Sequence, residues 1–358
     1  MMFDEENSGT RAVAPQHQFD VERLETFLSK SLSGFAGPVS VQQFKGGQSN
    51  PTYKLSTPNH HYVMRAKPGP AASLLPSAHA IEREYRVLKA LHGSDVPVAA
   101  PLLLCEDEAV IGRAFYLMEM MDGRVLWDPA MPGASADERS RLYDEMNRVI
   151  AALHKIDYAA VGLADYGKPG NYFARQTDRW TKQYRGAETE VIEAMDNLIA
   201  WLPRNMPVDD GLASIVHGDF RVDNLIFHAT QPRALAVLDW ELSTLGHPLA
   251  DFAYHCMAWR APRAFRGLAG ESLAALGIPD ERAYVEKYCD RTGFRVTGNW
   301  NFYLAFNLFR LAGINQGVAK RALDGTASSE QAQRVGKTTR PLAEMAWSYA
   351  QRTEKNLA

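Results

Sequence analysis

The sequence predicts an α+β protein with two lobes, a small β-rich lobe followed by a larger α-rich lobe. Short extended runs joined by a glycine-rich turn dominate before residue 122, and helical periodicity dominates after it. The length of 358 residues is about twice that of a common domain, which also favours two units. We therefore expect a loose, flexible tail over residues 1–16, the first lobe over 17–122 and the second lobe over 123–358.

The first lobe is expected to begin with a helix over residues 19–32, because Val21, Leu24 and Leu28 fall on one helical face. Extended runs then favour strands, and the segment 45–51 joins the first two of them at the spacing of a hairpin. Apolar residues at helical spacing favour a second helix later in the lobe. The expected strands are residues 39–44, 52–55, 62–66, 101–105 and 114–121, and the second helix is 76–91.

The second lobe is expected to be mostly helical, with a few short strands. Asp122 and Gly123 break the strand pattern at its start, and apolar residues at helical spacing follow from Ala136. The helices expected here are residues 136–157, 172–184 and 191–202, with further helices from residue 249 to the end. Three short apolar runs favour strands at residues 215–216, 225–227 and 235–238.

Composition and charge exclude several classes of protein. Apolar residues make up 46% and charged residues 23%, which rules out disordered, collagen-like and coiled-coil chains. The formal net charge of −3 argues against a dedicated nucleic-acid binder, which usually carries a strongly basic domain. Cys105, Cys256 and Cys289 are too scattered for a disulfide framework or a cysteine-based zinc site. No apolar run of signal-peptide or membrane length follows the acidic N-terminus, so we expect a cytoplasmic protein without membrane or nucleic-acid partners.

The most informative stretch is residues 217–224, which read HGDFRVDN and lie between two apolar runs. A third apolar run ends in Asp239, 20 residues after Asp219. Two acids and an amide on rigid strand-end loops suit Mg²⁺, which prefers one or two carboxylates together with water and phosphate oxygens. This arrangement is typical of phosphoryl transfer, with Asp219 free to accept a hydroxyl proton. The alternative is a plain turn in which Asp223 and Asn224 only cap the loop.

This pattern, with Leu-Asp-Trp-Glu at 238–241, resembles the aminoglycoside phosphotransferase/choline kinase family, small-molecule relatives of protein kinases. The resemblance covers residues 40–345. Within this family, the sequence most resembles the kinase-like domain that precedes some acyl-CoA dehydrogenase-family proteins. Further strings carry it: FKGGQSNPT at 44–52, LPSAH at 75–79, GLADYGKPGN at 162–171 and LDWELSTLGHPL at 238–249. The resemblance implies a bilobal protein-kinase-like fold, phosphotransfer to an alcohol group, and a functional link to an acyl-CoA dehydrogenase.

The resemblance implies a role for each residue of the catalytic region. Asp219 would be the catalytic base toward a substrate hydroxyl, and Asn224 and Asp239 would hold the Mg²⁺ that bridges the ATP phosphates. His217 and Asp251 would support this centre, Asp251 through hydrogen bonds to the loop that carries Asp219. The position of Asp251 is equally consistent with an acid near the positive end of a helix dipole, and the two interpretations are compatible.

A nucleotide site in the first lobe is also implied. The turn that would cover the phosphates consists of Gly46, Gly47, Ser49 and Asn50. Glycines let the backbone approach phosphate closely and offer unpaired N–H groups. The hinge, whose backbone would read adenine, is expected at Glu119, Met120 and Met121. The expected nucleotide is ATP, with GTP as the alternative.

One position departs from the kinase pattern. Arg65 stands where many kinases place a lysine, and its fork geometry differs from that of a point-charge ammonium. Lys67, two residues further along the same strand face, is a possible substitute. Glu84 is the expected helix partner of this cation, with Glu82 as the second choice.

The distribution of charge bears on the acceptor. Residues 241–350 carry 13 basic and 10 acidic residues, against 26 basic and 32 acidic residues in the rest of the chain. This disfavours a polycationic aminoglycoside and favours an anionic or neutral, partly apolar acceptor. The leading hypothesis is an ATP- and Mg²⁺-dependent kinase of a small hydroxylated molecule, with a hydroxyacyl compound or its CoA thioester as a candidate. The alternatives are a kinase-fold nucleotide-binding or regulatory protein without turnover, a protein kinase, and a metal hydrolase.

Overall fold

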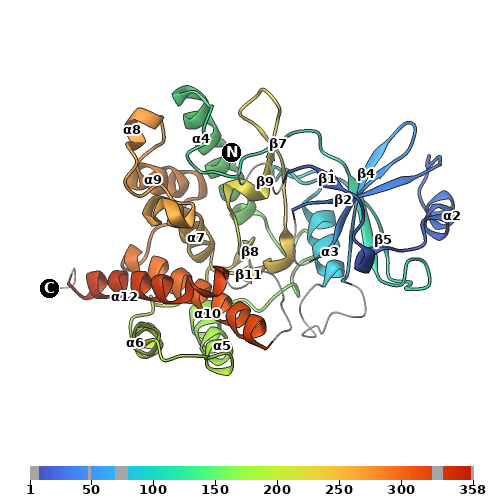
Figure 1. Cartoon of the computed structure of the whole chain (residues 1–358). Coiled ribbons are helices and arrows are strands. Elements are labelled where there is room, and N and C mark those ends of the chain that lie inside the picture. The colour runs from blue at the N-terminus through green and yellow to red at the C-terminus, as the bar shows by residue number, and fades with distance from the viewer. Residues whose placement is uncertain (1–7, 47–49, 69–79, 325–333, 356–358) are drawn as a thin grey trace.

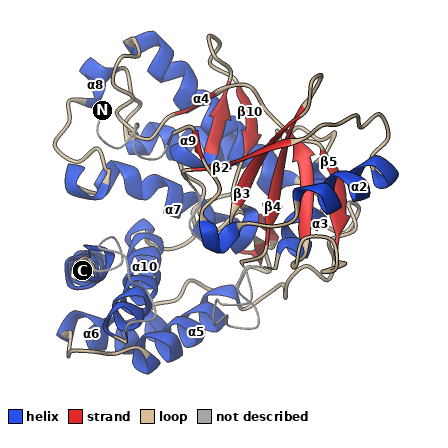
Figure 2. Cartoon of the chain, turned by 45° about the vertical axis from the view of Figure 1, so that its right-hand side comes forward, coloured by secondary structure: helices blue, strands red, loops and turns tan. Residues whose placement is uncertain are grey.

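The computed structural model describes residues 8–46, 50–68, 80–324 and 334–355. It contains a sheet-rich part at one side and a larger helical part at the other (Figure 1). Figure 2 shows the same division by secondary structure, with most strands in one part and helices α5, α6, α7 and α10 in the other. The order of these parts along the chain is the one expected from the sequence.

The first lobe is built on a six-stranded antiparallel sheet with the order β1-β2-β3-β4-β6-β5. Its strands are β1 (Thr10–Arg11), β2 (Ser40–Phe44), β3 (Thr52–Ser56), β4 (His61–Ala66), β5 (Pro101–Cys105) and β6 (Phe115–Glu119). The register pairs Arg65 of β4 with Thr52 of β3 on one side and Tyr116 of β6 on the other. Arg65 therefore extends from the interior of the sheet, where its backbone is fixed on both sides.

Two helices cover opposite faces of this sheet. Leu24 and Leu28 of α2 (Val21–Ser31) share an apolar cluster with Met64. Leu88 of α3 (Ile81–Leu91) instead belongs to the cluster that contains Val63. Because successive strand residues point to opposite faces, Val63 and Met64 mark the two sides of β4. Helix α3 thereby lies on the face that carries Arg65.

The N-terminal segment differs from the expected loose tail in its described part. Residues 1–7 lie outside the described residues, but Thr10–Arg11 forms strand β1 against β2. The amide of Lys45 donates to the carbonyl of Gly9 at 3.1 Å, and Nε1 of Trp127 donates to Oγ of Ser8 at 3.0 Å. A strand of two residues has no alternation pattern, so periodicity does not predict it.

The second lobe is mostly helical and contains two small antiparallel sheets. The sheets have the orders β10-β9-β7 and β11-β8, from β7 (Arg124–Val125), β8 (Ser214–Val216), β9 (Leu225–Phe227), β10 (Ala234–Val237) and β11 (Thr244–Gly246). The helices are α4 (Ala136–Lys155), α5 (Tyr172–Gly186), α6 (Glu193–Trp201), α7 (Pro248–Arg260), α8 (Leu273–Leu276), α9 (Glu281–Thr292), α10 (Trp300–Leu323) and α12 (Thr339–Lys355). Short 3₁₀ turns lie at η1 (Pro15–His17), η2 (Leu202–Arg204), η3 (Val222–Asn224), η4 (Trp240–Leu242) and η5 (Arg263–Phe265).

Helix α7 is the central element of the second lobe. It is buried along almost its whole length, and Pro248 at its first turn and His247 as its N-cap define where it begins. A helix that is apolar on all sides is typical of a core position, and α7 packs against both β8 and α10. This position lets one helix contact the loop that follows β8.

No helix in the described part of the chain is both long enough and apolar enough to cross a membrane.

Candidate active site

A cavity of about 580 Å³ lies between the two lobes. Its apolar wall is formed by Val63, Ala99, Met118, Ile226 and Val237. Polar residues also line it, among them Arg65, Asn224 and Asp239. The expected hinge residues Glu119, Met120 and Met121 and the expected turn residue Gly46 belong to the same lining. The volume is in the range of small-molecule sites, and an apolar wall with a few polar groups suits an aromatic base attached to a charged group.

Arg65 lies among three carboxylates. Its Nε is 2.9 Å from Oε2 of Glu84, and its Nη2 is 2.7 Å from Oδ1 of Asp239 and 3.4 Å from Oε2 of Glu241. Burial would lower the pKa of Arg65, but the carboxylates of Glu84 and Asp239 raise it, so the guanidinium stays charged. The pairing with Glu84 confirms the first of the two helix partners considered from the sequence.

Glu84 is fixed by two further side chains. Nδ2 of Asn50 donates to Oε1 of Glu84 at 2.8 Å, and the hydroxyl of Tyr116 donates to Oε2 at 3.2 Å. Burial raises the pKa of Glu84, while the guanidinium of Arg65 pulls it down. The side chain of Asn50 is fully buried in this contact, so it does not cover the cavity in the way expected of the turn. Gly47 and Ser49, the other members of that turn, lie outside the described residues.

Lys67 does not take the place of Arg65. Strand β4 ends at Ala66, but Lys67 still lies toward α3, on the face of Arg65. The ammonium of Lys67 instead pairs with Glu82 of α3, and Lys67 is not part of the cavity lining. The four charges thus form two separate pairs, Arg65 with Glu84 and Lys67 with Glu82.

Asp219 lies in the loop that follows β8, and its carboxylate is held by two donors. Nδ2 of Asn224 donates to Oδ2 of Asp219 at 3.0 Å and to its carbonyl oxygen at 2.8 Å. The hydroxyl of Tyr254 donates to Oδ1. Burial raises the pKa of Asp219, whereas the guanidinium of Arg221 and the hydrogen bond from Tyr254 oppose that rise.

Asp251 holds the backbone of the same loop from the first turn of α7. Its carboxylate accepts from the amides of His217 and Gly218 at 2.7 and 2.8 Å and contacts Nε2 of His154 at 3.1 Å. Burial alone would raise the pKa of Asp251, but the hydrogen bond and charge of His154 and the loop amides bring it below its usual value. Both interpretations made from the sequence therefore hold, since this acid lies at a helix N-terminus and bonds the loop.

His217 joins the two loops that carry the acids. Its Nε2 lies 2.7 Å from the carbonyl oxygen of Leu238, directly before Asp239, and its Nδ1 accepts from the amide of Asp219 at 3.2 Å. Asp239 itself has a positive φ of 63°, a conformation that non-glycine residues seldom adopt and that is common at functional sites. The side chain of His217 is buried, and its role here is to fix the spacing between the two loops.

The residues at the polar side of the cavity fit a divalent cation. Asp239 lines the cavity, and Glu84 and Glu241, which lie outside the lining, contact the same guanidinium of Arg65, so carboxylates outnumber the cation in this contact. Asn224 and Asp239 both line the cavity and offer an amide and a carboxylate, the kinds of ligand that Mg²⁺ takes alongside phosphate and water oxygens. Within the described ranges, no group of three or more His, Cys, Asp and Glu side chains could hold a metal ion alone. The metal-hydrolase hypothesis, which needs such a group, gains no support from them.

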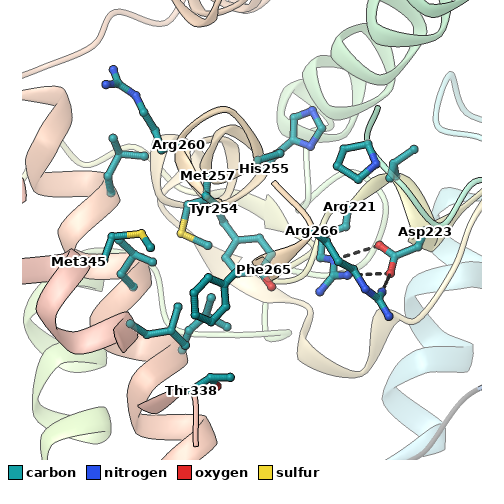
Figure 3. Close-up of a pocket in the computed structure, with 18 of the residues that line it drawn as sticks. Arg221, Asp223, Tyr254, His255, Met257, Arg260, Phe265, Arg266, Thr338 and Met345 are labelled. Carbon is teal, nitrogen blue, oxygen red and sulfur yellow. Dashed lines mark hydrogen bonds and ion pairs between the residues drawn. The ribbon is translucent and has the colours of Figure 1, made fainter. Parts of the chain in front are cut away.

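A second cavity of about 270 Å³ lies in the second lobe, next to Arg221 and Asp223 (Figure 3). Its lining is mostly apolar, from α7, α10 and α12, with Tyr254, Arg221 and Asp223 on one side. Arg221 and Arg266 both pair with Asp223, at 2.7 and 2.9 Å, and the carboxylate of Asp219 also acts on the charge of Arg221. Trp127 and Asp223 line both cavities, so the two share part of a wall.

Three residues of this region were not anticipated from the sequence: Tyr254, Arg310 and Trp127. Nη2 of Arg310 donates to the carbonyl oxygen of Gly218 at 2.6 Å, which ties α10 to the loop. The position of Tyr254 carried a usable signal, because it follows Asp251 by three residues and so lies on the same face of α7. Arg310 stands within a run of apolar residues on α10.

Comparison with known proteins agrees with this geometry. The model of the phosphotransferase enzyme family matches residues 40–286. Acyl-CoA dehydrogenase family member 10 of Mus musculus is 48% identical over 345 residues, which cover 95% of this chain but 32% of that protein. The chain therefore spans about a third of the length of this curated relative.

Solved structures have the same two-lobed, kinase-like fold. A protein from Ralstonia eutropha, provisionally described as an aminoglycoside phosphotransferase, is 63% identical with a TM-score of 0.86, over 94% of this chain and 99% of that one. An aminoglycoside phosphotransferase solved with ADP and hygromycin B is 14% identical with a TM-score of 0.59, over 91% of this chain and 97% of that one. The predicted α+β, bilobal fold is confirmed.

Proposed function

Because the chain belongs to the phosphotransferase enzyme family, we propose that it transfers the γ-phosphoryl group of ATP to a hydroxyl group of a small molecule. The observation that carries this proposal is the contact between Asn224 and Asp219 at 3.0 Å, beside the cavity that Asn224 and Asp239 line. A base, an amide and a second acid at one edge of a ligand-sized cavity are the parts that phosphoryl transfer requires.

The interlobe cavity is proposed to bind the nucleotide. Its apolar wall suits a purine ring, with the backbone of Glu119, Met120 and Met121 available to the ring edge. Arg65 at the polar side would meet the phosphates, and Gly46 would lie above them. The solved phosphotransferase that binds ADP and hygromycin B has a similar fold, which is consistent with this assignment.

The chemistry of the transfer follows from the residues at the polar side. Asp219 would accept the proton of the acceptor hydroxyl while the acceptor oxygen forms its bond to the γ-phosphorus. The bond from that phosphorus to the β–γ bridging oxygen breaks, and ADP leaves with that oxygen. Mg²⁺, held by Asn224 and Asp239 when bound, would supply positive charge to the phosphate oxygens. Asp251 and His217 would keep the two acidic loops in register throughout.

The second cavity is proposed to receive the acceptor. It shares Trp127 and Asp223 with the interlobe cavity, so a molecule that occupies it lies next to the phosphate region. Its mostly apolar lining, which also includes the guanidinium groups of Arg221 and Arg266, favours an acceptor with an apolar part and an anionic group. A hydroxyacyl compound or its CoA thioester has these features, and a polycationic aminoglycoside does not.

A functional link to an acyl-CoA dehydrogenase is proposed on the basis of the relatives. The mouse relative carries that name and is about three times as long as the matched segment. A kinase that modifies hydroxyacyl groups would prepare or remove substrates of such a dehydrogenase. The link can be tested by measuring whether this protein copurifies with an acyl-CoA dehydrogenase, or whether the product of one enzyme passes directly to the other.

A screen of nucleotide consumption tests the proposed activity. The full chain with Mg²⁺ and ATP or GTP is offered alcohols, sugars, amino alcohols and hydroxyacyl thioesters, and release of diphosphate nucleotide is measured. Asp219→Asn is expected to abolish turnover, whereas Asp290→Asn, at an exposed position of α9, leaves it unchanged. Turnover that survives Asp219→Asn would refute the assigned base. Tight ATP binding without turnover of any acceptor would favour the nucleotide-binding protein without catalysis.

A further inference from the structure

Tyr254 of α7 is directed at the carboxylate of Asp219. Its hydroxyl donates a hydrogen bond to Oδ1 of Asp219, and its side chain is almost fully buried. Tyr254 lies one helical turn after Asp251, which binds the backbone of the same loop through the amides of His217 and Gly218. One face of α7 therefore controls both the backbone and the side chain of the loop.

The two oxygens of Asp219 are held from different elements. Oδ2 accepts from Asn224, which belongs to the 3₁₀ turn η3 directly after the loop, and Oδ1 accepts from α7. A carboxylate with one donor can still rotate about its Cβ–Cγ bond, while a donor at each oxygen fixes its plane. The contact from Tyr254 is the one that comes from a rigid, buried helix.

Arg310 of α10 contacts both the ring of Tyr254 and the loop that carries Asp219. Its guanidinium lies 5.4 Å from the centre of the Tyr254 ring, and its Nη2 donates to the carbonyl oxygen of Gly218 at 2.6 Å. The stacked cation limits movement of the ring, and the hydrogen bond holds the residue before Asp219. Helices α7 and α10 thus hold the ring and the loop in one relative position.

We propose that Tyr254 is a positioning residue for the phosphotransferase reaction, whose hydroxyl orients the carboxylate of Asp219 toward the acceptor hydroxyl. This proposal rests on the proposed function, in which Asp219 accepts the proton. Tyr254 also lines the second cavity (Figure 3), so the same side chain contacts the proposed acceptor site and the carboxylate of Asp219.

The variant Tyr254→Phe removes the hydroxyl and keeps the ring. Because misplacement of a reacting group by about 1 Å can cost roughly a hundredfold in rate, we expect kcat for Mg·ATP hydrolysis, with water as acceptor, to fall by about 10- to 100-fold. The dissociation constant for ATP should stay within about twofold, because Tyr254 is not part of the interlobe lining. Thermal unfolding of the variant shows whether it is folded.

Tyr184→Phe is the matched control. Tyr184 of α5 is equally buried, and its hydroxyl has no hydrogen-bond partner among the described residues. Its loss should leave both kcat and ATP binding unchanged. A kcat of Tyr254→Phe that stays within twofold of wild type would overturn the proposal. A fall in kcat matched by an equal weakening of ATP binding would do the same, because it would indicate a general loss of structure.

A spectroscopic measurement separates this proposal from the proposed function. The full chain is labelled with ¹³C at Cζ of its 14 tyrosines, and the signal absent from Tyr254→Phe is that of Tyr254. This signal should shift in Asp219→Asn and stay in place in Asp290→Asn. If it does not respond to Asp219→Asn, the proposal is overturned whether or not the protein turns over ATP. If it responds while wild type consumes no nucleotide under any condition, the orientation by Tyr254 stands and the proposed function fails.

Discussion

Arg65 and Asp239, which are 174 positions apart in the chain, join the two lobes through a contact of 2.7 Å. The same guanidinium lies 2.9 Å from Glu84 of α3, so one side chain of the central sheet connects a first-lobe helix to a second-lobe acidic loop. The side chains of Arg65 and Glu84 are nearly inaccessible to water, at 9% and 2% exposure. Because these charges are buried, the loss of any one member leaves another charge without compensation and is costly.

Two replacements of Arg65 should show how much of its contribution to stability depends on its charge and how much on the shape of the guanidinium. Arg65→Ala leaves Glu84 and Asp239 without a counter-charge, and we expect the free energy of unfolding to fall by about 3–5 kcal/mol. Arg65→Lys keeps the charge, but a single ammonium cannot reach both carboxylates with the fork of a guanidinium, so a loss of about 1–2 kcal/mol is expected. Urea unfolding followed by circular dichroism measures both values. Equal losses in the two variants would contradict the assigned geometry.

Gly218 should tolerate no side chain, although it is small and lies in a loop. Its φ is +83°, and an added Cβ would lie 2.8 Å from the carbonyl oxygen of Leu242. Gly93→Ala is a matched control, because Gly93 also has a φ of +83° but has nothing within 4 Å of the added Cβ. Both variants bear the cost of a left-handed residue, about 1 kcal/mol, and Gly218→Ala should lose about 1–3 kcal/mol more. Urea unfolding of the two variants side by side gives the difference, and no difference would exclude the close approach.

The longer elements of the fold could be predicted because their residues repeat with a period. The helix expected over 172–184 is α5, and the strand expected at 101–105 is β5 with the same bounds. The strand expected at 225–227 is β9, which was predicted from a short apolar run and not from a period. Strands β1, β7 and β11 have only two or three residues, too few for an alternation to appear, and they exist because neighbouring strands offer unpaired edges. Periodicity therefore accounts for the layers, and tertiary pairing accounts for the short strands.

The site could be predicted only where its residues lie close together in a motif. Asp219 and Asn224 are five residues apart, and their contact follows from that spacing. Tyr254 and Arg310 reach the same loop from 35 and 92 positions away, and no local pattern carries such contacts. Lys67 lies on the face of Arg65, as the alternation predicts, but its ammonium pairs with Glu82 and not with Glu84. Which carboxylate a long side chain reaches depends on the tertiary fold.

Asp239 should control metal-dependent nucleotide binding specifically. We expect Asp239→Asn to raise the dissociation constant of ATP by about tenfold or more in Mg²⁺, because the metal loses a charged ligand, and to change it little in EDTA. Isothermal titration in both buffers measures the effect. Glu241→Gln is the control, since Glu241 contacts the same guanidinium at 3.4 Å but is not part of the cavity lining. An equal effect of the two variants in Mg²⁺ would mean that the charge near Arg65 matters and metal ligation by Asp239 does not.

Buried His255 should make the protein lose stability as the pH falls from about 6.5 toward 4. Burial lowers the pKa of His255 from 6.5 to about 4, so in this window the unfolded chain binds a proton that the folded chain does not. A gap of this size corresponds to about 3 kcal/mol by pH 4. His255→Gln, which can still bond the hydroxyl of Tyr284, should flatten the decline, and His61→Gln at an exposed position should not. Urea unfolding at a series of pH values measures the slopes, and an unchanged slope in His255→Gln would show that this histidine is protonated equally in both states.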